Sequence, residues 1–509
     1  MLVYALTKMH LLSPLVAFLA VVISWLFLWN RRARVSAARL GIPSLQFEGD
    51  NSPFRYASEM QSLMDKGYNQ YLRQGLPFSI RNPTDPKRRF VILPMKYLEE
   101  VRTAPESLLS FPLFLEKANL LKEIGGPSMN SQVTHMVRVD MNRALSNLVP
   151  LMYEACVAAM QKVLPPCSEW TAITPYESIL QIFSRTTARM LVGSELCQSD
   201  EWITVALEYT STCLSSISSV RERYSPSLRW LARYTSPDVK KAAKLHQRAV
   251  RILKPHLEAR LRHEIETDSS GGDAIQWLIS VYENRGLKLT PDQLAYDELL
   301  LTVASIHSSS ATALATLLDL ITYPESLAEI RDEIARVNAK HGTWTRNALG
   351  DLRILDSFMT ESMRLHSVAQ LTMQRYAASQ VTFKDGLRIP AGTQISFANH
   401  QVNLDSDLHP QAEHFDPKRA LRKREQIDSN KFHFASVSDD AINFGSGFHA
   451  CPGRFLAQEA LKMMFIHLLM NYDLKFPDES TVRPPDIKRN FNSMPNFKAP
   501  ILFRERGFT

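Results

Sequence analysis

The chain has 509 residues, of which 45% are hydrophobic and 22% are charged, so it can bury a sizeable core. Its formal net charge of +7 suits an anionic membrane surface or an acidic redox partner, and no aromatic and basic motif indicates a nucleic-acid partner. Five cysteines without disulfide-like spacing, and a single Asn-x-Ser/Thr triplet at Asn82 that proline disables, exclude a disulfide scaffold and indicate a reducing compartment.

The amino terminus carries an uncharged apolar stretch from residue 11 to 29, about 19 residues, which is long enough to cross a bilayer as one helix. The run Asn-Arg-Arg-Ala-Arg follows at residues 30–34 and holds the downstream side in the cytosol. A cleaved signal peptide is the alternative, but Trp25 and Trp29 stand where small residues would be needed at the cleavage site. We therefore predict a single-pass anchor over residues 1–34.

The remainder of the chain shows no repeat, linker or low-complexity block. We expect a short hinge at residues 35–50 and one large domain over residues 51–509. Its fold class is predicted to be mainly α with a small β-sheet region. Strands are predicted over residues 77–82 and 88–93, as a hairpin, and as strand, turn and strand over 386–398. Helical periodicity predicts helices that include residues 199–214, 273–283, 324–340 and 453–472.

Two segments allow two interpretations each. Residues 224–237 mix Trp, Tyr and Arg between prolines, which favours either a second membrane contact or core packing of Trp230. The charged run at residues 421–426 is typical of a solvated loop or helix face, with a basic docking surface for a redox partner as the alternative.

Two motifs in the carboxyl-terminal part of the chain contain charged residues. In ESMRLH, Glu361 and Arg364 are three residues apart and share one helix face, where they can form a charge-assisted pair. The segment HFDPKRA adds Arg419 in an F-x-P-x-R pattern. Alone, the Glu361 and Arg364 spacing would also fit an exposed helix pair.

The stretch FGSGFHACPGRF at residues 444–455 frames the lone cysteine Cys451 with glycines and a proline. One interpretation is a dinucleotide fingerprint, since Gly445, Gly447 and Ala450 match G-x-G-x-x-A, but the preceding segment lacks the apolar residues of a buried parallel strand. The other makes Cys451 a metal ligand, because flanking glycines permit close backbone approach and a following helix points its amino end at the sulfur. No second cysteine has CxxC spacing, which excludes zinc ribbons and iron–sulfur clusters.

These motifs together resemble the cytochrome P450 family. The pattern F-x-x-G-x-H-x-C-x-G has Phe444, Gly447, His449, Cys451 and Gly453 in register. It stands in the family's order after the E-x-x-R and F-x-P-x-R motifs. The resemblance implies the cytochrome P450 fold and haem b as the cofactor.

Carried over by position, the resemblance implies a role for each matched residue. Cys451 would be the axial thiolate ligand of the iron, and Phe444 would shield the haem on that side. His449 and Arg375 match positions that reach haem propionates, and the glycines of the motif complete the cofactor site. The family's helical Trp-x-x-x-Arg is not intact in SQVTHMVRVD, where Arg138, or else His135, is the candidate contact.

The resemblance also implies a structural role for the charged motifs. Glu361, Arg364 and Arg419 would form a buried network that fixes the polypeptide around the haem. The distal pocket would be lined by the loop at residues 111–130, by Ala304 and Ser308, and by residues 368–371 and 493–497.

The central helix departs from the family pattern. Where the family has Ala-Gly-x-Asp/Glu-Thr, this chain has ASIHS, which puts His307 at the acid's position and Ser308 at the alcohol's. Both are candidate catalytic residues, because an imidazole that titrates near neutrality can pass protons; a contact of His307 with substrate is the alternative. The substitution resembles fungal, ent-kaurene-oxidase-like enzymes of terpenoid secondary metabolism, and indicates a lipophilic, terpenoid-derived substrate.

The implied activity is a membrane-anchored monooxygenase that uses O2 and NADPH electrons delivered by a separate cytochrome P450 reductase. It would reside in the endoplasmic reticulum membrane with its catalytic domain in the cytosol. Two alternatives stay open: a haem-thiolate enzyme that rearranges or dehydrates its substrate without activating oxygen, and a haem-binding or electron-transfer protein without turnover.

Overall fold

The computed structural model describes residues 41–82, 89–262, 264 and 271–507. The predicted anchor and its arginines, and the first part of the predicted hinge, lie outside the described residues. Within the rest of the hinge, the backbone at Pro43 and Leu45 forms hydrogen bonds of 2.8 Å with Ser79, so this segment is tied to the first strand of the domain.

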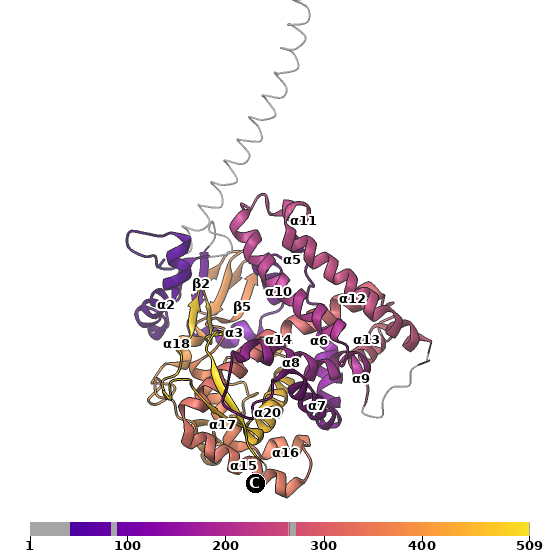
Figure 1. The fold of residues 1–509 in the computed structure, drawn as a ribbon. Coiled ribbons are helices and arrows are strands. Elements are labelled where there is room, and N and C mark those ends of the chain that lie inside the picture. Colours follow the sequence, from indigo (N-terminus) through magenta and orange to yellow (C-terminus); the bar gives the residue numbers. More distant parts are fainter. Residues whose placement is uncertain (1–40, 83–88, 263, 265–270, 508–509) are drawn as a thin grey trace, which may run out of the picture.

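Helices form most of the molecule; in the view of Figure 1 most of them lie to one side of the main sheet, and α2 (Pro53–Gln70) lies on the other. The longest described helix is α14 (Pro291–Thr322). It begins where the Thr290 hydroxyl accepts a hydrogen bond from the Gln293 backbone and where Pro291 occupies the first helical position. It packs against α8 (Pro175–Leu191), α10 (Asp200–Arg223), α12 (Pro237–Leu261) and α20 (Arg454–Asn471). Its length and apolar composition would suit a membrane span, but it is largely buried, as a core helix is.

The remaining helices surround this centre. They comprise α2 (Pro53–Gln70), α3 (Leu98–Thr103), α4 (Phe111–Ala118), α5 (Leu121–Ile124), α6 (Ser131–Met136), α7 (Asn142–Val163), α9 (Gly193–Leu196), α11 (Ala232–Thr235), α13 (Ala274–Glu283), α15 (Pro324–His341), α16 (Arg346–Asp351), α17 (Arg353–Leu365), α18 (Asn399–Asn403) and α19 (Arg419–Gln426). The four segments with predicted helical periodicity all lie in helices, in α10, α13, α15 and α20.

The main sheet has five strands in the order β1-β2-β8-β5-β3. The predicted hairpin is confirmed: β1 (Phe78–Arg81) and β2 (Arg89–Leu93) are antiparallel, with Ile80 opposite Phe90. Strand β8 (Gln394–Phe397) is parallel to β2 and antiparallel to β5 (Thr372–Ala377), and β3 (Leu109–Ser110) forms the edge. The strands predicted over residues 386–398 are also present, but β7 (Arg388–Ile389) pairs with β6 (Val381–Thr382) and not with β8.

Two further small sheets are built mainly from strands of the carboxyl-terminal segment. Strand β12 (Ile501–Glu505) pairs with both β4 (Thr171–Ile173) and β9 (Tyr472–Lys475), and β10 (Ile487–Arg489) pairs with β11 (Asn492–Met494). The fold is thus mainly α with small sheets, as the sequence predicts.

Three local predictions need correction. Core packing of Trp230 is wrong, because this side chain is 59% exposed on a short turn between α10 and α11. The run at residues 421–426 belongs to α19 and is not wholly solvated, since Arg424 is buried against Asp356, with 3.7 Å between Nη1 and Oδ2. The segment 111–130 is not a continuous loop, because it contains α4 and α5.

Candidate active site

The loop at residues 444–453, called the cysteine loop below, makes a tight bend before α20. The Cys451 backbone N–H donates to the Phe444 carbonyl over 2.7 Å, and Ala450 donates to Gly447 over 3.1 Å. Gly447 has a φ of +66°, and a Cβ built there would lie 3.0 Å from the carbonyl oxygen of Arg102 in α3. This glycine is therefore required by both its backbone conformation and its close neighbour.

The sulfur of Cys451 lies in an environment that can hold a thiolate. Burial raises the pKa of the Cys451 thiol, while the backbone N–H groups of Gly453 and Arg454 donate to the sulfur and oppose that increase. Both groups belong to the start of α20, which begins at Arg454, so the positive end of the helix faces the sulfur. A bound metal cation would remove the remaining barrier to deprotonation.

Phe444 and strand β5 pack around this bend. The Phe444 ring lies edge-on to Phe434, with centroids 5.6 Å apart, and it contacts the main core. The Ser446 backbone N–H lies 3.0 Å from the sulfur of Met373 in β5. The loop is therefore held between the core and the sheet.

Three basic side chains, Arg138, Arg375 and His449, gather at the cysteine loop and are called the basic cluster below. The Arg375 guanidinium lies 5.5 Å from the Phe111 ring centre, and the His449 ring lies 5.7 Å from the same ring. Arg138 lies over the ring of Phe448, 4.0 Å from its centre. These contacts bring together residues that the sequence separates by more than one hundred positions.

The charge of this basic cluster is incompletely neutralised. Arg375 is only 2% exposed, its Nη1 donates to the Gln374 carbonyl, and its Nη2 is buried without a hydrogen-bond partner among the described residues. Burial lowers the pKa of Arg375 to about 10, although Glu106 partly opposes this. Burial, followed by the charges of Arg375 and Arg138, lowers the pKa of His449 to about 4.

Among the described residues, the carboxylate found in contact with the basic cluster is Glu106, whose oxygen lies 2.7 Å from Nε2 of His449. Nε2–H of that ring donates to Glu106, and Nη2 of Arg375 still lacks an acceptor among the described residues. An external anion is thus the missing partner, and the carboxylates of haem propionates have the required chemistry. The residues present fit the cofactor that the sequence predicts.

Of the two sequence candidates on the segment before α7, the structure brings only Arg138 to the cysteine loop. His135 is exposed in α6, whereas Arg138 lies on the π-helical turn Val137–Met141. Such turns interrupt the regular helix and redirect side chains, often at functional sites.

Glu361, Arg364 and Arg419 come together as one network, called the triad below. Arg364 binds Glu361 through two hydrogen bonds, 2.9 Å from Nε and 2.7 Å from Nη2, and the Arg419 Nε lies 3.1 Å from both carboxylate oxygens. Glu361 is 2% exposed, so this is not a surface pair. Arg364 Nη1 also donates to the carbonyls of Asn403 and Ala412 over 2.6 Å. These bonds tie α17, which carries Arg364, to the segment before the cysteine loop.

The middle of α14 has an open face. Ala304 and Ser308 are exposed although most of this helix is buried, and their spacing of four residues puts them on one side. The Ser308 hydroxyl donates to the Ala304 carbonyl over 3.2 Å. His307, beside them, lies 3.3 Å from the hydroxyl of Tyr176 in α8 through its Nδ1.

Two of the predicted pocket segments lie side by side. The Gln370 N–H donates to the Phe491 carbonyl over 3.0 Å, and Ser493 donates to Val368 over 3.1 Å. These bonds join residues 368–371 to the β10 and β11 hairpin.

The competing interpretations of the cysteine loop find no support. The described residues directly before the loop form only an isolated bridge between Ser438 and Ala441, so the strand that a dinucleotide fingerprint needs is missing. Cys156, Cys167, Cys197 and Cys213 are buried, and burial raises the pKa of Cys156 to about 12. No group of three His, Cys, Asp or Glu ligands lies together in the described ranges.

Two residues near the site were not predicted. Glu106 pairs with His449, and Tyr176 contacts His307 across 131 positions of sequence. Neither belongs to a local motif, so only the folded chain brings them to their partners.

Known proteins of one family resemble this chain over most of its length. The family model described as Cytochrome P450 matches residues 128–499. The cytochrome P450 monooxygenase cheE of Chaetomium globosum is 41% identical over 471 residues, which cover 92% of this chain and 91% of the relative. The pyrichalasin C-7 hydroxylase of Pyricularia grisea is 39% identical over 468 residues, covering 90% and 91%.

A solved structure has the same fold. The retinoic acid bound cyanobacterial CYP120A1 aligns with a TM-score of 0.66 at 16% identity, covering 92% of this chain and 100% of that one. The match over 128–499 and the full-length relatives show that the chain belongs to the cytochrome P450 family and is a cytochrome P450 monooxygenase.

Proposed function

We propose that Cys451 is the axial thiolate ligand of haem b and that the basic cluster binds the haem propionates. The observation that carries this proposal is the buried Nη2 of Arg375, which has no hydrogen-bond partner among the described residues and belongs to the basic cluster at the cysteine loop. In the same loop, the sulfur of Cys451 accepts two backbone N–H groups. A haem held there by Cys451 would supply the activation of oxygen, because a thiolate ligand favours cleavage of the O–O bond.

The chain's own residues on α14 would orient the substrate and dioxygen. The exposed face of α14 at Ala304 and Ser308 would border the bound substrate and dioxygen. His307 and Ser308 stand where the family's acid and alcohol supply protons. His307→Ala is therefore expected to keep its haem but to consume NADPH with poor coupling, and Ser308→Ala is expected to show the same defect more mildly.

The substrate is proposed to be a lipophilic secondary metabolite that is hydroxylated or oxidised in several steps. Fungal relatives support this class, and one of them is a pyrichalasin C-7 hydroxylase. The His307 substitution favours a terpenoid-derived compound, so both a pyrichalasin-type compound and terpenoids belong in the test. The residues that border the site, such as Ala304 and Phe497, are small or apolar.

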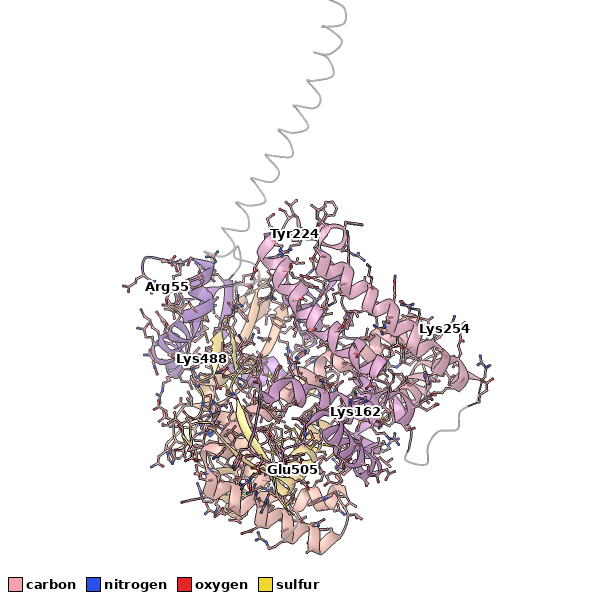
Figure 2. All side chains as sticks on the ribbon, in the orientation of Figure 1. Arg55, Lys162, Tyr224, Lys254, Lys488 and Glu505 are labelled. Carbon is pink, nitrogen blue, oxygen red and sulfur yellow. The ribbon has the colours of Figure 1, made fainter. Side chains whose placement is uncertain are left out.

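We further propose that the protein is anchored in the endoplasmic reticulum membrane through residues 1–34 and receives electrons from NADPH–cytochrome P450 reductase. An exposed apolar patch, made of Leu228, Trp230 and Tyr234, supports a second membrane contact, since Tyr234 is 67% exposed. Figures 1 and 2 place α11 and Tyr224 toward one end of the molecule, and Arg55, next to the exposed Phe54, lies toward the same end.

The test is expression of the full chain in microsomes with and without a P450 reductase. Pyrichalasin-type precursors and terpenoid intermediates are added, and products are read by mass spectrometry. Oxidised product that requires both NADPH and the reductase supports the proposal. Product without either would indicate a rearrangement or dehydration, and absence of any product with a fully loaded haem would indicate a binding or electron-transfer role.

A further inference from the structure

The contact between Tyr176 and His307 joins the first turn of α8 to the middle of α14. The Tyr176 hydroxyl lies 3.3 Å from Nδ1 of His307. The Tyr176 ring is buried and stacks on Phe497, with centroids 3.8 Å apart and planes inclined by 15°. Phe497 belongs to the segment predicted to line the pocket, so the phenol is fixed between that segment and the central helix.

The direction of this hydrogen bond follows from the available partners. Within the described ranges, His307 is the side chain found to bond the Tyr176 hydroxyl, and Nε2 of His307 is buried without any partner. If Nδ1–H donated to the phenol oxygen, the phenol proton and the Nε2 lone pair would both be left unsatisfied. If the phenol O–H donates to Nδ1, only the Nε2–H group lacks a partner. Buried donors rarely stay unpaired, so this N–H group is left for an acceptor from outside the chain.

Neither His307 nor Tyr176 carries a charge near pH 7 that would change this choice of tautomer. Burial lowers the pKa of His307, and it raises the pKa of Tyr176 to about 12. Both groups are therefore neutral near pH 7, and the position of the single ring proton is what the contact decides.

We propose that Tyr176 is a positioning residue that holds His307 in the Nε2–H tautomer and makes this N–H a buried donor to an oxygen atom from outside the chain. His307 lies three residues after Ala304 and so adjoins the open face of α14. The acceptor is the oxygen of a water molecule in the proton supply or of the substrate. This inference deepens the proposed function and rests on it for the place of the site, but the hydrogen bond itself can be tested without turnover.

The first experiment reads the tautomer directly. Full-length holoprotein with ¹⁵N-labelled histidine is studied by NMR as its diamagnetic ferrous carbon monoxide complex, and the His307 signals are assigned by their loss in His307→Gln. We expect the Nε2–H tautomer in the wild type and a mixture of both tautomers in Tyr176→Phe, which keeps the stacked ring but lacks the hydroxyl. An Nδ1–H or doubly protonated ring in the wild type, or an unchanged tautomer in Tyr176→Phe, would overturn the proposal.

The second experiment reads the consequence in a double-mutant cycle. With a pyrichalasin-type or terpenoid compound that the microsomal panel converts, Tyr176→Phe should change one property by about two- to tenfold, the value of one hydrogen bond. A fall in product per NADPH identifies water as the acceptor, and a rise in the substrate Kd from the spectral shift identifies the substrate. Because a glutamine amide can donate near the Nε2 position without a phenol partner, Tyr176→Phe should add nothing in the His307→Gln background.

Tyr153→Phe is the matched control, since Tyr153 is also a partly buried phenol whose pKa burial raises to about 12, but it packs on Trp344 in a different region. It should leave the tautomer, the coupling and the Kd unchanged. An equal effect of Tyr176→Phe in both His307 backgrounds would overturn the positioning role. Failure of the whole panel would count against the proposed function, while the NMR result would still decide this inference.

Discussion

The triad and the basic cluster both bury arginine side chains, but only the triad supplies its own counter-charge. Glu361 binds two guanidinium groups, and backbone carbonyls accept the remaining N–H groups of Arg364. In the basic cluster, Arg375 is equally buried, yet its Nη2 has no acceptor within the described part of the chain. The difference separates a network whose charges are paired within the described chain from one that keeps a buried N–H group without an acceptor there, as the proposed binding of an anion requires.

This contrast has an energetic meaning. A buried ion pair with all its hydrogen bonds satisfied tolerates removal of neither partner, because the other is then left as an unpaired buried charge. A buried cation without a partner already carries that penalty in the free protein, and a bound anion removes it. The first kind stabilises the fold, and the second kind is poised to bind.

The largest expected effect is the loss of the cofactor itself. Cys451→Ala should abolish the red-shifted Soret band of the reduced carbon monoxide complex, because no other described cysteine lies in a glycine-framed bend at a helix start. Cys156→Ala, which removes a buried thiol elsewhere, should keep the band. A retained band in Cys451→Ala would mean that another cysteine is the thiolate ligand, and that the haem is not held by the cysteine loop.

Breaking the triad should be the next largest change. Arg364→Ala leaves Arg419 as the remaining guanidinium partner of the buried Glu361 and removes the donor to the Asn403 and Ala412 carbonyls. It is expected to lower the free energy of unfolding by about 3 to 5 kcal/mol, with little folded holoprotein recovered. Chemical denaturation and haem content provide the measurements, with Arg353→Ala, an exposed arginine of the same helix, as the control. Normal stability of Arg364→Ala would erase the distinction between the two arginine groups.

The basic cluster should respond in the opposite way. Arg375→Met replaces a buried cation whose Nη2 has no acceptor among the described residues by an apolar chain, so the haem-free protein should be unchanged or more stable by about 1 to 3 kcal/mol. The loaded protein should lose haem faster to an excess of a haem-acceptor protein. Arg388→Met, at an exposed site in β7, serves as control; a destabilised apoprotein with unchanged haem release would assign Arg375 to the fold.

The smallest expected effect concerns the membrane, outside both arginine groups. Deletion of residues 1–34 should release the protein from microsomes only in part, and Trp230→Ala with Tyr234→Ala in the truncated chain should release more. Sedimentation of microsomes measures the bound fraction, and Ile427→Ala, which truncates an exposed apolar residue after α19, should release none. Complete solubility after the deletion alone would exclude the second contact.

Much of the triad could be predicted from sequence, because a spacing of three residues on a helix places Glu361 and Arg364 together whatever surrounds them. The burial that makes this pair structural could not, since it depends on the carbonyls of Asn403 and Ala412 from a different segment. In the same way, the sequence left open whether Trp230 packs in the core and whether residues 421–426 are solvated, because both depend on which side chains the fold covers.

The sequence by itself determined the family, the cysteine loop and the order of its motifs, because these depend on local spacing and on residue types that a bend or a helix requires. Tertiary structure alone decided that Arg138 and not His135 reaches the loop, that Glu106 pairs with His449, and that Tyr176 contacts His307. The physical reason is that neutralisation of a charge and the tautomer of an imidazole depend on atoms that approach through folding from distant parts of the chain, and no local pattern records that approach.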